Sequence, residues 1–224
     1  MRSRIGPWVL ALSAVTACEG IEPPIRGPGY SFDDFTGLTF HWPAYRLPVR
    51  FWVSPESGDV AQYVQTAIGV WRDQLLFGEF DGRLVPDAAG ADVWIAVTPS
   101  APPEAPLSDA PPQIQACEGV TAFDTTSTPV DGGVGRLRIA APLQITVAWD
   151  GRFSEADIVN CLYRVTVHEI GHALGIFSHS LDSLDIMNGV PRVRDPSTRD
   201  RETLLRVYHT PADLEPPFLE VPRP

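Results

Sequence analysis

The motif His168-Glu169-Ile170-Gly171-His172 constrains this chain more than any other feature of its sequence. Two histidines four residues apart lie one turn apart on one face of a helix, so both imidazole rings can reach a single metal ion. Glu169 points toward the same cleft, where a carboxylate can act as a general base. The motif therefore predicts a helix that carries two metal ligands, and zinc suits this ligand set.

The residues after this motif supply further candidates. Gly175 allows a sharp turn at the end of the helix, because glycine adopts left-handed conformations at little cost. The turn can bring His179 back to the ion as a third ligand, and Met187 can provide an apolar floor below the three imidazole rings. Three histidines leave the fourth position of a tetrahedral zinc ion open to water.

These residues resemble the metzincin metallopeptidases, and most closely the matrixins, whose pattern is HExxHxxGxxH followed by a methionine in a tight turn. The residues that match are His168, Glu169, His172, Gly175 and Met187. The resemblance implies an α+β fold over residues 38–210. That fold has a twisted mixed sheet, an upper helix, a long zinc-binding helix, the Met-turn and a C-terminal helix.

The chain departs from the matrixin pattern at the third ligand. The pattern places a histidine where this chain has Ser178, and His179 comes one position later. Either the loop carries one extra residue or the ligand set is altered. We expect an extra residue, because the interval from His179 to Met187 equals the matrixin interval and a serine hydroxyl is a poor zinc ligand.

The resemblance implies a zinc-dependent endopeptidase that acts on proteins or peptides. One catalytic zinc ion is expected on His168, His172 and His179, with Glu169 as the general base that activates water. The alternative is a zinc-stabilised binding lipoprotein without catalysis. Glu169 favours the enzyme, since a structural zinc site needs no general base and closes its fourth position with another ligand. Calcium is a further candidate, which no motif indicates.

Two features bear on substrate binding. The residues 119–124 are expected to form an edge strand that holds an extended peptide. Arg164 lies four residues before His168 on the same helical face. In some collagenase-like matrixins an arginine at this place closes the bottom of a substrate pocket, which would make the pocket shallow or selective for polar side chains. The alternative is an arginine that pairs with a carboxylate on a solvated face.

Hydrophobic periodicity predicts alternating strands and helices over the rest of the domain. Six prolines between positions 99 and 112 predict a long irregular loop. The expected strands are 47–53, 91–97, 119–124 and one or two within 135–148, and the expected helices are 59–76, 154–174 and 197–208.

The N-terminal residues read as a targeting signal. Two arginines precede an apolar stretch over residues 5–15 that is too short to span a bilayer, so 1–17 is predicted to be a signal peptide. The tetrapeptide that ends at Cys18 resembles the bacterial lipobox, in which the cysteine is lipidated, and the alternative is a plain secretory signal. Residues 18–37 are then a lipid-anchored linker, and 211–224 are a proline-rich tail. We expect a cell-envelope location, as an outer-membrane lipoprotein or an exported protein.

The cysteine count and the charge limit the other possibilities. If Cys18 carries lipid, Cys117 and Cys161 remain as a pair in an oxidising compartment, where a disulfide is the default and two unpaired buried thiols are the alternative. The net charge is -11 and all 17 basic residues are arginine. Such an acidic chain without basic clusters repels phosphate backbones, which excludes nucleic acid as a partner. We expect a monomer attached to the membrane through its N-terminal lipid.

Overall fold

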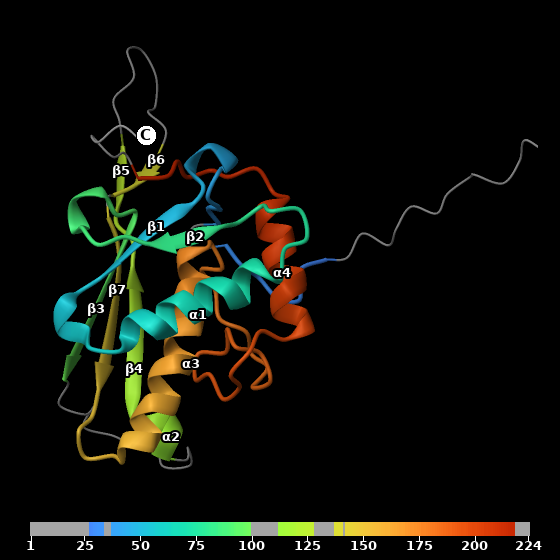
Figure 1. Ribbon diagram of the computed structural model, residues 1–224. Helices are drawn as coiled ribbons and strands as arrows, with labels where there is room; N and C mark the ends of the chain where they lie inside the picture. Colours follow the sequence, from blue (N-terminus) through green and yellow to red (C-terminus); the bar gives the residue numbers. More distant parts are fainter. Residues whose placement is uncertain (1–26, 34–36, 100–111, 128–136, 141, 218–224) are drawn as a thin grey trace, which may run out of the picture.

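The computed structural model describes residues 27–33, 37–99, 112–127, 137–140 and 142–217, which form an α+β fold with a mixed sheet (Figure 1). The strand order in the five-stranded sheet is β2-β1-β3-β7-β4, and β4 alone runs antiparallel to its neighbour. A separate antiparallel pair joins β5 to β6. The strands are β1 (Val49–Val53), β2 (Gly82–Leu84), β3 (Val93–Pro99), β4 (Cys117–Ala122), β5 (Thr125–Ser127), β6 (Leu137–Ile139) and β7 (Leu143–Trp149).

Two helices cover one face of this sheet. Partly buried and exposed residues alternate along β4, and buried and exposed residues alternate over most of β7, as expected for strands with one covered face. The helix α3 packs against both of these strands and against α1, while α4 lies on the side of the helices away from the strands (Figure 1). The helices are α1 (Val60–Arg72), the short α2 (Pro112–Gln115), α3 (Glu155–Ala173) and α4 (Thr198–Tyr208).

The long helix α3 has clear start and stop signals. The Ser154 side chain accepts a hydrogen bond from the Asp157 backbone N–H at the N-terminus. Gly175 follows the helix with a φ angle of +107°, and a Cβ atom there would lie 1.9 Å from the carbonyl oxygen of Phe40. Only glycine fits this position, so the chain must leave the helix here.

The sequence prediction located the main helices and strands, with differences at their ends. The first helix ends at Arg72 and not at 76, because Leu75 reaches the core from a turn and so continues the apolar pattern beyond the helix. The edge strand β4 begins at Cys117, two residues before the predicted start. The short strands β2 and β5 and the one-turn helix α2 were not predicted, since three or four residues carry no periodic signal.

The packed domain extends beyond 38–210 at both ends, which corrects the predicted boundaries. Tyr30 and Phe32, assigned to the linker, pack against the core. Leu214, assigned to the tail, is buried, and Glu215 pairs with Arg138 of β6. Cys18 and the predicted signal peptide lie outside the described residues. Among the helices that the structure describes, none has both the length and the apolar character needed to cross a bilayer.

A disulfide joins Cys117 at the start of β4 to Cys161 in α3, with Cα atoms 5.8 Å apart. The two residues are 44 positions apart in the sequence. The bond therefore ties the edge strand directly to the helix that carries the HExxH motif.

Candidate metal centre

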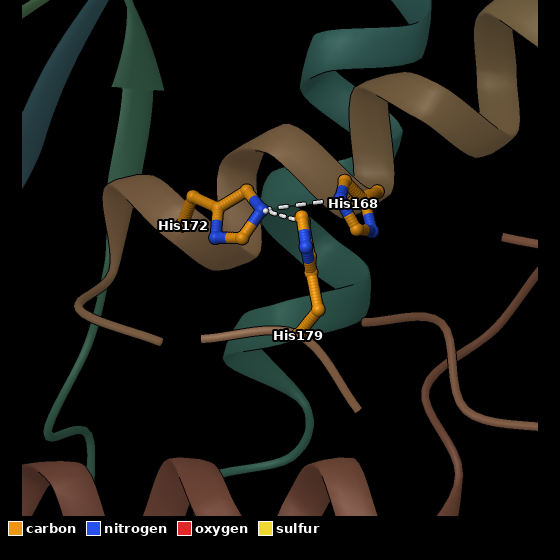
Figure 2. A group of neighbouring side chains, drawn as sticks. All are labelled: His168, His172 and His179. Atoms are coloured by element: carbon orange, nitrogen blue, oxygen red, sulfur yellow. Dashed lines mark hydrogen bonds between the residues drawn. The ribbon is translucent and has the colours of Figure 1, made fainter. Parts of the chain in front are cut away.

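Three histidine side chains converge at the end of α3 (Figure 2). His168 and His172 project from one face of the helix, and His179 approaches from the loop that follows Gly175. The Nε2 atom of His172 lies 3.1 Å from Nε2 of His168 and 3.1 Å from Nε2 of His179. This group could hold a metal ion. The hydroxyl of Ser178 instead donates to the backbone carbonyl of Asp33 at 2.6 Å.

Backbone carbonyls determine which nitrogen of each helical histidine carries a proton. Nδ1 of His168 lies 2.7 Å from the Ile186 carbonyl oxygen, and Nδ1 of His172 lies 2.6 Å from that of Ile176. A carbonyl oxygen only accepts hydrogen bonds, so each Nδ1 must be the donor. Both neutral rings therefore direct the lone pair of Nε2 toward the centre of the group.

Two such lone pairs 3.1 Å apart repel each other unless a cation or a proton lies between them. Burial lowers the pKa of His168 to about 4 and lowers the pKa of His172 and of the more exposed His179 below the usual range. Protonation of these rings is therefore disfavoured at neutral pH. A metal cation satisfies the lone pairs without this cost.

Glu169 lies beside the three histidines and is buried. The Thr121 hydroxyl of β4 donates to the Glu169 carboxylate at 2.6 Å. Burial raises the pKa of Glu169 to about 7, and the hydrogen bond from Thr121 opposes part of this increase. A carboxyl group with a pKa near neutrality can both accept and donate a proton in that range.

The edge strand β4 approaches α3 very closely at Gly119. A Cβ atom at this position would lie 2.4 Å from Oε1 of Glu169 and 2.5 Å from Cγ1 of Val165. Glycine is therefore required for the strand to pass next to the carboxylate. Glu169 is positioned by contacts from β4 that the sequence motif does not reveal.

Met187, the methionine predicted to support the histidines, lies against α3. Met187 is fully buried, and a Cβ atom on Gly171 would lie 2.3 Å from its sulfur. The backbone N–H groups of Ile186 and Met187 donate to the Asp200 carboxylate of α4 at 2.8 and 3.3 Å. The turn therefore packs against α3 and is hydrogen-bonded to α4.

The site opens into a cavity of about 480 Å³. β4 forms one wall, and the three histidines and Glu169 lie at the cavity surface. Arg164 also lines the cavity and is only 4% exposed, so it does not lie on a solvated face. Burial and the nearby Arg194 lower the pKa of Arg164.

The sequence indicated the histidines, Glu169 and Met187, and the structure brings them together. The sequence did not indicate Thr121, Asp200 or the carbonyl groups of Ile176 and Ile186. These groups carry no local signature, because each acts through a contact decided by folding. A search against protein-family models finds no match for this chain, and a comparison with curated proteins finds no significant match.

Proposed function

We propose that this protein is a zinc-dependent endopeptidase of the metzincin type. The observation that carries the proposal is the convergence of three Nε2 atoms, two of them with their Nδ1 protons engaged by carbonyls, beside a buried glutamate in an open cavity. A structural metal site has no use for a buried carboxyl group next to an open position.

The donor set fits zinc. Zinc binds imidazole nitrogens at about 2.0–2.1 Å in tetrahedral geometry, which puts two ligand nitrogens about 3.3 Å apart. The Nε2 separations of 3.1 Å are close to this value before any adjustment of the rings. The backbone carbonyls that accept from Nδ1 are the usual outer partners of histidine ligands, and they increase the basicity of the rings.

A zinc ion held by His168, His172 and His179 would supply Lewis acidity, which would make water more acidic and stabilise negative charge on a carbonyl oxygen. Glu169 takes the proton from the attacking water and delivers it to the leaving amine. The Thr121 hydroxyl holds the Glu169 carboxylate in place by donating a hydrogen bond to one carboxylate oxygen. His168, Glu169 and His172 are buried, so electrostatic interactions among them are stronger than in bulk solvent.

The edge of the sheet provides a template for the substrate. β4 has β7 on one side, and its other side borders the cavity. Val120 in this strand is 61% exposed although it is apolar. An extended peptide can add to such an edge through backbone hydrogen bonds. We propose that the substrate chain lies along β4 with its scissile bond next to Glu169.

Arg164 is proposed to limit substrate choice. Its guanidinium group is a buried cation in the cavity lining, close in sequence to His168. A substrate side chain that enters this part of the cavity must be short or must offer oxygen atoms. When the variant Arg164→Leu cleaves a peptide library, its preference should shift toward substrates with a larger apolar side chain in this part of the cavity.

The substitution Glu169→Ala tests the peptidase proposal. The variant should bind one zinc ion per chain, as wild type does, and should cleave an unfolded protein substrate about 10²–10⁴ times more slowly, because the general base is lost. Glu155→Ala, at the exposed start of the same helix, is the matched control and should cleave normally. Equal cleavage by Glu169→Ala and wild type would refute the peptidase proposal. A metal-binding chain that cleaves nothing would favour the binding lipoprotein.

We also propose that the protein is anchored to the cell envelope through lipid on Cys18, with an outer-membrane location. The proposal rests on the lipobox-like sequence before this cysteine. Each buried CH₂ group of a lipid contributes about 0.8 kcal/mol to membrane binding, and stable anchoring takes two chains or one chain with a second signal.

A further inference from the structure

The segment Tyr30–Asp33, hereafter the strap, lies against the metal centre although it is far from it in the sequence. The backbone N–H of Tyr30 donates to the Thr203 hydroxyl of α4 at 3.3 Å. A Cβ atom on the preceding Gly29 would lie 2.6 Å from the carbonyl oxygen of Arg199. The start of the strap is therefore in close backbone contact with α4.

The first residue of the strap is connected to His168. The Tyr30 hydroxyl donates to Asp200 at 2.6 Å, and burial together with this carboxylate raises the pKa of Tyr30. Asp200 accepts from the N–H groups of Ile186 and Met187. The carbonyl of Ile186 is the group that receives the Nδ1 proton of His168. Three consecutive hydrogen bonds thus join the strap to the first metal ligand.

The later residues of the strap reach the loop that supports the other two ligands. The N–H of Phe177 donates to the Phe32 carbonyl at 2.8 Å, next to Ile176, whose carbonyl holds His172. The Ser178 hydroxyl donates to the Asp33 carbonyl at 2.6 Å.

Ser178 directly precedes His179 in the chain. Its hydroxyl therefore gives the strap a hydrogen-bond donor next to the third candidate ligand.

We propose that the strap is a positioning device for the metal centre, and that it couples the N-terminal segment to the affinity of the site. Its residues belong neither to the candidate metal-binding group nor to the described lining of the cavity. They act on the backbone groups that orient the three imidazole rings. The inference rests on the proposed metal site and goes beyond it, because it assigns a role to residues before the predicted domain start.

The variants Tyr30→Phe and Ser178→Ala test this inference in the full chain. Each removes one hydroxyl and keeps the rest of the side chain. Loss of an outer partner of a metal ligand typically weakens metal binding about 10–100-fold. We expect about 3–10-fold weaker zinc binding for each variant, since each acts one step further away, and about 10–100-fold for the double variant. Zinc affinity is measured by competition with a chromophoric chelator.

Cobalt(II) provides a second readout that does not depend on cleavage. Its visible absorption should lose intensity in the double variant as the ligand geometry becomes less regular. Ser178→Thr keeps the hydroxyl and should restore the affinity of wild type. Tyr45→Phe is the matched control for Tyr30→Phe, because Tyr45 is 73% exposed and lies outside the strap. This control should bind zinc as wild type does.

The outcomes separate the strap from the metal site itself. If the double variant binds zinc within twofold of wild type, the proposed positioning role of the strap is wrong. A lower melting temperature of the metal-free double variant would not rescue that role, because it would show only that the strap stabilises the fold. A wild-type chain that binds neither zinc nor cobalt would overturn the proposed function, and the strap would fall with it.

Discussion

The substitution Gly119→Ala provides a strict test of how β4 positions the general base. The added Cβ would lie 2.4 Å from Oε1 and 2.6 Å from Cγ of Glu169, whereas ordinary van der Waals contact begins at 3.4 Å. The carboxylate must therefore move by about 1 Å, or the strand must move away from the helix. The disulfide at Cys117, two residues earlier in β4, opposes movement of the strand.

The expected loss of activity follows from this displacement. A misplacement of about 1 Å in a reacting group can lower a rate about 10²-fold. Overpacking of this kind also destabilises a protein by about 1–3 kcal/mol, which corresponds to a decrease of about 2–12 °C in melting temperature for a chain of this size. The atoms nearest to the added methyl group belong to Glu169 and Val165, and carbonyl contacts hold His168 and His172 independently of β4, so zinc binding should be nearly unchanged.

The assay compares cleavage of an unfolded protein by zinc-loaded Gly119→Ala and Gly69→Ala. Gly69 lies in α1, where the nearest atom to an added Cβ is 3.9 Å away, so the control should cleave normally and gain about 0.5–1 kcal/mol of stability. If Gly119→Ala binds zinc and cleaves within threefold of wild type, Glu169 does not act from the position described, and the reasoning about β4 is wrong.

Four further results are expected. Removal of zinc by a chelator should lower the melting temperature by about 10 °C, because a ligand at 1,000 times its Kd stabilises by about 4 kcal/mol; no change would contradict a specific site. In the metal-free protein the raised pKa of Glu169, about 7, favours the neutral acid, so stability is lost as the pH rises from the unfolded value near 4.5 through 7. Glu169→Gln should therefore gain up to about 3 kcal/mol over wild type at pH 8 and almost nothing at pH 4, as measured by denaturant unfolding; a constant difference would refute the shift. The disulfide Cys117–Cys161 closes a loop of 44 residues, so its reduction should lower the free energy of unfolding by about 4 kcal/mol. An unfolding midpoint of Cys161→Ala equal to that of wild type would count against the bond. Cys18→Ser should abolish partitioning into detergent phases, and unchanged partitioning would remove the lipid anchor.

The sequence alone was enough to predict one part of the site. His168, Glu169 and His172 belong to one helix, and the geometry of an α-helix places residues four positions apart on one face whatever the rest of the fold does. The turn at Gly175 is also a local property, since its φ angle of +107° suits glycine. The main strands and helices followed from apolar periodicity for the same reason, because that signal depends on neighbouring residues.

The tertiary structure decided how these residues are held. Thr121 reaches Glu169 across 48 positions of sequence, and Tyr30 reaches Asp200 across 170. Contacts at such separations depend on how strands and helices pack, and neither residue type nor spacing records them. The predicted domain start at 38 was too late for this reason, because a segment rich in glycine and proline shows no periodicity even when its few aromatic residues are packed against the core. Local chain geometry therefore supplied the ligands, and long-range packing supplied the groups that orient them.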